Sequence, residues 1–293
     1  MAPAPRPFDY SEAFSRNVGW VTEAELKTLR NKRVAIAGLG GVGGLHLLTL
    51  TRMGVGKFNL SEFDDFDLPN FNRQVGAMMS TVGRPKLDVL IEMAKDINPE
   101  LDIRAFPGGV NESNLPDFLD GVDVYVDGID YFAFDARRAT YAACARKGIP
   151  ATIAVPLGMG ASGLTFLPGG MSFDDYFGMA GQPELEQAIR FLVGVSPAML
   201  QRTYVADPTR VNLAKRTGPS TPMACMICAG VAATEAVKLM LGRGDIIAAP
   251  RGFHYDAYRN KYVKTWRPWG HRNPITRVML AIIKAQLRRM GAM

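Results

Sequence analysis

The chain has 293 residues, of which 47% are hydrophobic, and it carries 34 Lys and Arg against 28 Asp and Glu, a net charge of +6. This length and composition allow one large α/β domain with an insertion, or a domain plus a small appendage, and no low-complexity tract or internal repeat stands out. The start lacks a signal-peptide pattern, no apolar run reaches the length of a membrane span, and only three cysteines occur, so we expect a reduced, cytoplasmic protein.

Residues 34–37 are short, apolar and partly β-branched, which predicts a strand, and the glycine run GLGGVGG follows them directly. Apolar residues at helical spacing then continue to Gly54. Gly38, Gly40 and Gly43 satisfy G-x-G-x-x-G: the first permits a tight turn, the second lets the backbone approach a phosphate, and the third lets helix and strand pack closely. With the unpaired N–H groups of a helix start, this pattern predicts a nucleotide site, although glycine turns also serve packing alone.

A second strand, residues 57–60, leads to Glu62, which stands at the usual distance past the first glycine for a ribose ligand. Glu62 is therefore the expected contact to the ribose hydroxyls. Taken alone, these features would fit a nicotinamide or flavin enzyme.

The motif NFNRQ supplies Asn70, Arg73 and Gln74, and GRPK ends in Lys86. A dinucleotide pyrophosphate is satisfied mostly by helix N–H groups, whereas a triphosphate in a displacement reaction needs Arg and Lys to stabilise the charge of the transition state. The two cations therefore favour a triphosphate over a dinucleotide, with solvated surface charge as the alternative.

The alternating valines of residues 122–126 predict a buried strand that delivers Asp127 and Asp130 to its carboxyl end. Ligands bind beyond the carboxyl ends of strands in open parallel sheets, and an aspartate there can hold Mg²⁺ together with phosphate oxygens. Asp130 is the candidate, and an N-cap for a helix near Ala133 is its structural alternative.

In this order, GLGGVGG, SEFDDFD, NFNRQ, VGRPK, INPE, DGID and the later helix ACMICAGVAATEAVKLMLG resemble the ThiF/MoeB-type adenylyltransferases, which share their fold with the adenylation domains of ubiquitin-activating enzymes. The resemblance covers most of the chain. It implies an α/β fold with a Rossmann-like, mostly parallel sheet flanked by helices, a crossover insertion and a basic C-terminal helix. It also implies catalytic roles for Arg73, Lys86 and Asp130, with Mg²⁺ at Asp130. The ATP-binding residues that it implies are Gly38, Gly40, Gly41, Gly43, Glu62, Asp64, Asn70 and Gln74.

Family members begin with a segment whose arginine reaches the ATP of the other protomer, and FSRNVGW is similar, with Arg16 as the matching catalytic residue. A homodimer follows if Arg16 acts in this way, and a loose N-terminal arm is the alternative. The chain departs from the family after the strand that ends at Asp127. Tyr131 replaces the usual Asn, and Asp135 stands near the place of an arginine, for which Arg137 is the nearest substitute.

Many relatives carry two CxxC pairs around a structural zinc, but this chain has only Cys144, Cys225 and Cys228, and its three histidines do not complete a site. We therefore expect no structural zinc. Cys225 or Cys228 could accept the acyl group as a thioester, yet both stand at the head of an Ala/Gly-rich helix, which favours packing instead. Cys144 is also expected in the core.

From Arg251 to the end, ten Lys and Arg stand against one acidic residue, a net charge of +9, while the rest of the chain carries about −3. Residues 271–293 predict a basic amphipathic helix that packs on its own domain or dimer mate, or else binds tRNA or an anionic membrane surface, which would make the protein peripheral. In the family the crossover, residues 171–222 here, helps to cover the substrate. Its aromatic and acidic cluster at residues 173–177 is a candidate contact or a structural plug.

We expect four segments: an N-terminal arm and helix over residues 1–32, a nucleotide-binding Rossmann-like half over 33–170, a crossover segment and acceptor-binding half over 171–270, and the basic tail over 271–293. The resemblance implies adenylation of a carboxylate by ATP, above all the C-terminal glycine of a small ubiquitin-like or sulfur-carrier protein. The alternatives are activation and cyclisation of a carboxylate on a modified tRNA adenosine, an NAD-dependent oxidoreductase, and a non-catalytic nucleotide-binding module.

Overall fold

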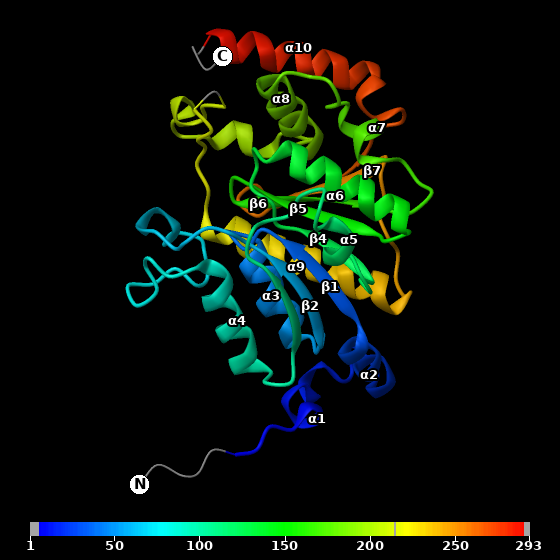
Figure 1. Cartoon of the computed structure of the whole chain (residues 1–293). Coiled ribbons are helices and arrows are strands. Elements are labelled where there is room, and N and C mark those ends of the chain that lie inside the picture. Colours follow the sequence, from blue (N-terminus) through cyan, green and yellow to red (C-terminus); the bar gives the residue numbers. More distant parts are fainter. Residues whose placement is uncertain (1–5, 214, 290–293) are drawn as a thin grey trace.

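Alternate residues of the central strands bury against opposite layers of helices, which gives the molecule three layers (Figure 1). On β1 (Arg33–Ala37), Val34 and Ile36 pack into one core cluster, while Ala35 and Ala37 pack into the other. The computed structural model describes residues 6–213 and 215–289.

The described residues form an eight-stranded sheet in the order β3-β2-β1-β4-β5-β6-β7-β8. Neighbours from β3 to β5 pair in parallel and neighbours from β5 to β8 in antiparallel, which confirms the mostly parallel, Rossmann-like sheet. The order reverses between β1 and β4, and such a switch point is where open α/β sheets bind ligands. The remaining strands are β2 (Lys57–Ser61), β3 (Asp102–Phe106), β4 (Val124–Asp127), β5 (Ala151–Leu157), β6 (Gly160–Phe166), β7 (Arg251–Asp256) and β8 (Lys261–Trp266).

The helices divide between the two faces of the sheet, and a short pair precedes β1. One face is covered by α3 (Gly43–Arg52), α4 (Lys86–Ile97) and α9 (Pro222–Leu241). The other is covered by α5 (Leu115–Phe118), α6 (Phe134–Lys147), α7 (Phe173–Phe177), α8 (Glu184–Val195) and α10 (Pro274–Arg289). The pair is α1 (Tyr10–Ala13) and α2 (Glu23–Asn31). Short 3₁₀ turns are η1 (Ser15–Asn17), η2 (Leu68–Asn70), η3 (Leu200–Tyr204), η4 (Pro208–Arg210) and η5 (Gly270–Arg272).

Helix α9 is the most apolar helix of the second half of the chain. The Thr221 hydroxyl caps its start, and Gly242 ends it in the left-handed conformation. By length and composition alone it could cross a membrane, so the expectation that no segment reaches that length is wrong for α9. Half of its apolar window is buried, and Cys228 and Ala232 pack into the core cluster that also contains β4, β5 and β6 residues, as expected of a helix in a protein core.

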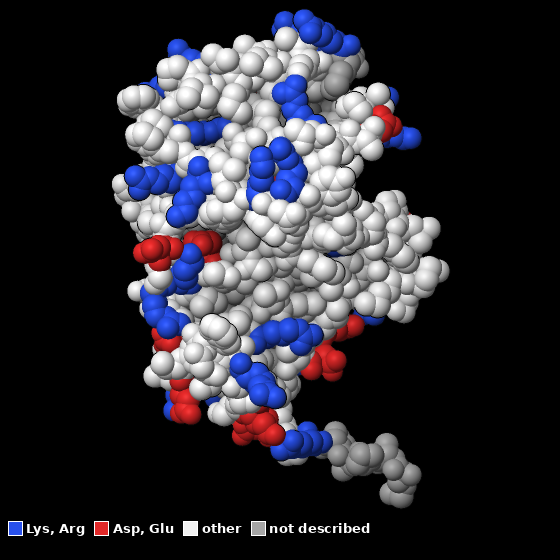
Figure 2. Space-filling view, turned by 180° about the vertical axis from the view of Figure 1, so that it is seen from behind, with Lys and Arg blue, Asp and Glu red and all other residues white. Residues whose placement is uncertain are grey.

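The basic tail packs its apolar stripe on its own domain. Leu280, Ile283 and Leu287 of α10 join the core cluster of α6, α7 and α8, and Lys284 pairs with Glu186 of α8 at 2.6 Å. In Figure 2 the end of the molecule that carries α10 displays mostly Lys and Arg, whereas acidic side chains gather toward the other end. The cluster at 173–177 is α7, whose aromatic rings are buried, so the structural alternative holds for them.

Candidate functional site

Three glycines join the loop after β1 to the loop after β4. Gly38 adopts a φ of +80°, and a Cβ placed on Gly43 would lie 1.8 Å from the Gly38 carbonyl oxygen. A Cβ on Gly128 would lie 2.2 Å from the same oxygen. Only glycine therefore allows this approach. Gly128 was not recognised in the sequence, although it stands inside the DGID motif.

The remaining glycines of the loop face open space or side chains of the site. The nearest atom to a Cβ on Gly40 would be Gln74 Nε2, at 3.8 Å, so its outer side leaves room for a phosphate. A Cβ on Gly41 would lie 3.4 Å from the Arg73 stem and 3.3 Å from Cys225 Sγ. The structure thus brings together the glycine loop, Gln74 and Arg73.

Glu62 is buried at the end of β2, where its carboxylate accepts three backbone N–H groups. The donors are Leu39 of the glycine loop at 2.8 Å, Phe63 at 2.8 Å and Asp64 at 3.1 Å. A carboxylate offers about four acceptor positions, so a ribose hydroxyl can still be accommodated. Glu62 therefore holds the glycine loop against the end of β2 through the Leu39 N–H, in addition to its expected contact with the ribose hydroxyls.

Lys86 opens α4, and its side chain is only 6% exposed. Its ammonium lies 3.1 Å from the carboxylate of Asp64, which is itself 54% exposed. A buried ammonium needs a partner, and Asp64 provides it from the segment after β2. The two expected site residues therefore neutralise one another.

Asn70 ends the 3₁₀ turn η2, and Arg73 and Gln74 lie in the loop that follows it. Asn70 accepts a hydrogen bond from the Asp67 N–H at 3.1 Å, which closes the turn. The Arg73 guanidinium donates to the Pro69 carbonyl at 3.1 Å and to Asn72 Oδ1 at 2.9 Å, and its remaining N–H groups have no partner among the described residues. Gln74 is buried, and its Oε1 has no hydrogen-bond partner among the described residues. A bound ligand with a hydrogen-bond donor would supply one.

Asp130 lies on the exposed loop between β4 and α6. One of its carboxylate oxygens accepts from the Phe132 N–H at 3.0 Å, which forms a local turn. The cap of α6 is Ala133, so the helix N-cap alternative is wrong, because Asp130 stands too far upstream. Asp130 is exposed, and its second carboxylate oxygen accepts no hydrogen bond from the described residues.

Arg137 is enclosed and does not face the loop as a phosphate contact. Its Nε donates to Asp127 at 2.8 Å, and its other nitrogens donate to the carbonyls of Ile129 and Tyr131. Arg137 therefore does not replace the family's arginine after this strand, because its guanidinium is buried and bound to Asp127 and to two backbone carbonyls. The Asp127–Arg137 pair instead supports the backbone that carries Asp130.

Cys225 stands in the first turn of α9, directly behind the glycine loop. Burial raises the pKa of the Cys225 thiol, although the Ser220 hydroxyl and Arg73 act in the opposite direction. Burial also raises the pKa of Cys228 and raises that of Cys144 to about 12. The three thiols are free, buried and held in their neutral form.

Arg16 lies away from the glycine loop of its own chain. It is exposed on η1, next to Asn17, whose amide donates to the Arg52 carbonyl at the end of α3. The glycine loop stands at the other end of that ten-residue helix, roughly 15 Å away. The structure therefore does not bring Arg16 to the other site residues of the same chain.

A magnesium ion would depend on one protein carboxylate here. Within residues 6–213 and 215–289, no group of three or more His, Cys, Asp and Glu could hold a metal ion. Mg²⁺ keeps several waters and commonly uses one or two carboxylates together with substrate phosphates, which fits the free oxygen of Asp130. The arrangement as a whole can bind a polyphosphate: the glycine loop, Arg73, Lys86 with its partner Asp64, and the exposed Asp130 lie near the switch point of the sheet.

The chain is similar to known proteins over most of its length. A model of the ThiF family matches residues 14–278. The tRNA threonylcarbamoyladenosine dehydratase of Bacillus subtilis is 38% identical over 138 residues, which cover 47% of this chain and 54% of that protein. The SAMP-activating enzyme E1 of Haloferax volcanii is 26% identical over 231 residues, which cover 78% of this chain and 74% of that protein.

The chain spans about half the length of the dehydratases that it matches. Among solved structures, Escherichia coli MccB with ATP superposes with a TM-score of 0.65 at 18% identity, over 92% of this chain and 75% of that one. At this identity the likeness shows the fold.

Proposed function

Because the chain belongs to the ThiF family, we propose that it is an ATP-dependent adenylyltransferase that transfers AMP to a carboxylate. The observation that carries the proposal is the contact of Gly38, Gly43 and Gly128, since it places the Asp130 loop beside the glycine loop. An anion-binding loop and a metal-binding carboxylate at one switch point suit a nucleoside triphosphate.

The proposed reaction is a displacement at the α-phosphorus of ATP. An acceptor carboxylate oxygen forms a bond to this phosphorus, the bond to the bridging oxygen breaks, and pyrophosphate leaves with that oxygen. The ionised acceptor needs no general base, so catalysis consists of alignment and charge stabilisation. Arg73 and Lys86 would spread the phosphate charge, Glu62 would orient the ribose, and the glycine loop would hold the phosphates. Mg²⁺ held by Asp130 would add further charge stabilisation when it is bound.

A homodimer would complete the site. Arg16 is too far from its own glycine loop, so it could act only in the site of a second copy. Exposed apolar side chains support such a contact: Met226 of α9 is 63% exposed, and Trp20, near Arg16, is 85% exposed. Exposed apolar side chains of this size are typical of interfaces.

Two acceptor classes have support. The first is the C-terminal glycine of a small ubiquitin-like or sulfur-carrier protein, supported by the similarity to the SAMP-activating enzyme over 78% of the chain. The second is a carboxylate on a modified tRNA adenosine. The similarity to the dehydratases supports it, and so does the excess of Lys and Arg after residue 251, because RNA binding depends on neutralising phosphates.

ATP–pyrophosphate exchange with Mg²⁺ tests the reaction. The wild type would be assayed with proteins that end in Gly-Gly, with tRNA from cells that lack this protein, and without acceptor. Arg73→Ala should lower exchange by about 100-fold or more if Arg73 stabilises the transition state. Arg52→Ala is the matched control, since Arg52 is exposed at the far end of α3.

Exchange with one acceptor would name the acceptor class. ATP binding without exchange under every condition would contradict the proposal in favour of a binding module, and NAD binding without need of Mg²⁺ would favour an oxidoreductase.

Replacing the cysteines tests whether a thioester forms after adenylation. We propose that the chemistry of this chain ends at the adenylate, because its thiols are buried and neutral. Cys225→Ala and Cys228→Ala should then retain both ATP–pyrophosphate exchange and formation of the acyl-adenylate. A covalent, thiol-sensitive adduct between acceptor and enzyme that disappears in one of these variants would contradict this part of the proposal.

A further inference from the structure

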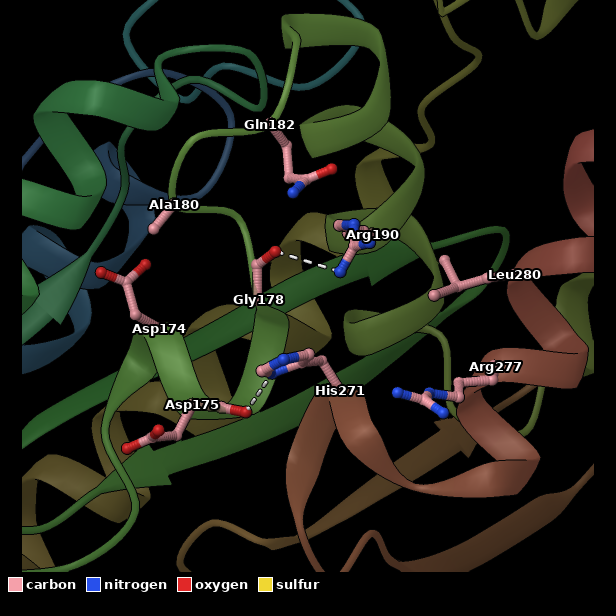
Figure 3. Close-up of a pocket in the computed structure, with 9 residues that line it drawn as sticks. All are labelled: Asp174, Asp175, Gly178, Ala180, Gln182, Arg190, His271, Arg277 and Leu280. Atoms are coloured by element: carbon pink, nitrogen blue, oxygen red, sulfur yellow. Dashed lines mark hydrogen bonds between the residues drawn. The ribbon is translucent and has the colours of Figure 1, made fainter.

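A cavity of about 430 Å³ lies between α7, α8, η5 and α10, outside the glycine-loop site (Figure 3). Two arginines and a histidine line it from three different elements: Arg190 of α8, His271 of η5 and Arg277 of α10. Figure 3 shows all three directed toward the same hollow. None of the residues assigned to the proposed adenylation lines this cavity.

His271 is fixed in one orientation. Its Nδ1 lies 2.8 Å from the Asp175 carbonyl oxygen. A carbonyl only accepts, so Nδ1 carries the proton and Nε2 remains available to a ligand. Gly178 allows the ring to lie against the backbone, since a Cβ at this position would stand 2.4 Å from His271 Cγ and the φ of Gly178 is +66°.

Arg190 is also held in place with donors to spare. Its Nε pairs with Glu186 at 2.8 Å, and one terminal nitrogen donates to the Gly178 carbonyl at 3.0 Å. Glu186 also pairs with Lys284 at 2.6 Å. One carboxylate is therefore shared by two cations, so Glu186 does not fully neutralise the charge of Arg190 at the cavity wall.

Arg277 adds a second positive charge. It forms no side-chain hydrogen bond or ion pair with the described part of the chain. The two acidic lining residues have partners elsewhere: Asp174 pairs with Arg138 at 2.8 Å, and the Asp175 carboxylate accepts from the Ser172 hydroxyl at 2.6 Å. In Figure 3 the Asp175 carboxylate points away from His271 and Arg277, and Asp174 is already paired with Arg138, so neither carboxylate neutralises Arg277.

We infer that this cavity binds a phosphate-bearing ligand of about nucleotide size. The planar guanidinium groups of Arg190 and Arg277 suit phosphate oxygens, and His271 Nε2 suits a hydroxyl or an acidic proton of the ligand. A volume of about 430 Å³ exceeds that of a bare phosphate, and Leu280 and Ala180 supply an apolar wall for a sugar or base. Two sources share this chemistry: a nucleotide unit within an RNA strand, and a free mononucleotide.

Binding without Mg²⁺ or ATP tests the inference independently of adenylation. Fluorescently labelled tRNA and a labelled 12-nucleotide single-stranded RNA would be titrated by anisotropy at two salt concentrations. AMP and inorganic phosphate would be titrated by calorimetry in the Arg73→Ala background, so that the glycine-loop site contributes less. Arg277→Ala is the test variant. Arg288→Ala is the control, because it removes an equal charge from the same helix outside the cavity.

Arg277→Ala should weaken one of these probes by about tenfold, as loss of a charged hydrogen bond does, while Arg288→Ala should change affinity by less than about twofold. Loss of the RNA probes would identify a strand as the source, and loss of AMP a free nucleotide. Arg277→Lys should recover part of the affinity. The inference is wrong if the wild type binds none of the probes, or if the two alanine variants lose affinity equally.

Discussion

Asp127 at the end of β4 and Arg137 in α6 form a 2.8 Å ion pair whose side chains are 0% and 3% exposed. The same guanidinium donates to the carbonyls of Ile129 and Tyr131. The loop that presents Asp130 is thus held from beneath by one buried arginine. This contact links the helical layer of α6 to the proposed metal ligand.

Replacing Arg137 with Met should lower the free energy of unfolding by about 3–5 kcal/mol, because it leaves the Asp127 carboxylate buried without its partner. Chemical denaturation would measure the loss. Arg138→Met is the control: Arg138 pairs with the half-exposed Asp174, so its removal should cost no more than about 1 kcal/mol. Equal losses in the two variants would contradict a special role for the buried pair.

Two glycines of one loop should respond differently to alanine. Gly43→Ala places a methyl group 1.8 Å from the Gly38 carbonyl, so the backbone must shift and the melting temperature should fall. Gly40→Ala meets nothing closer than 3.8 Å, so it should fold normally but bind ATP more weakly, because the methyl group occupies the phosphate approach. Thermal melting with and without ATP distinguishes the two, and Gly218→Ala, in open space, is the control.

Acid should destabilise the fold through two buried histidines. Burial lowers the pKa of His46 to about 3 and that of His254 to about 4, below the ordinary value of 6.5. Between the lowered pKa of each folded histidine and the ordinary value of 6.5, the unfolded chain binds more protons than the folded chain. The free energy of unfolding therefore falls as the pH drops below about 6.5. The slope should approach 1.4 kcal/mol per pH unit for each histidine.

His46→Leu isolates one of these contributions. Neither ring nitrogen of His46 has a hydrogen-bond partner among the described residues, so an apolar side chain of similar size costs little at pH 8. Denaturation at pH 8 and pH 5 should show a smaller loss for the variant than for the wild type. An unchanged difference between the two pH values would rule out His46 as the source.

Two neighbouring isoleucines test how the tail is anchored. Ile283 is 8% exposed and Ile282 is 47% exposed. Ile283→Ala should cost about 2–4 kcal/mol of unfolding free energy, whereas Ile282→Ala should cost no more than about 0.5 kcal/mol. Similar small losses in both would mean that α10 adds little to the domain core in solution, and would revive membrane or RNA attachment as its main role.

Local spacing predicted the glycine loop and the strand ends, because glycine positions and apolar periods act within a few residues, whereas the mostly parallel sheet was implied by the family resemblance. It could not predict what depends on distant parts of the chain. The closeness of Gly128 to Gly38 and the position of Cys225 behind Gly41 each join segments about 90 or more residues apart, and Arg137 is enclosed in part by the Phe191 ring of α8. The cavity at Arg190, His271 and Arg277 is likewise formed by residues from the crossover and the tail, and no sequence motif predicts it.

The ion pair between Lys86 and Asp64 means that the site carries an anion of its own. A phosphate that reaches Lys86 must displace this carboxylate or share the ammonium with it. Nucleotide affinity is therefore a competition between two anions, and removing Asp64 should alter it by removing the competitor as well as a ligand contact. The pair gives the buried ammonium a partner whenever no phosphate is bound.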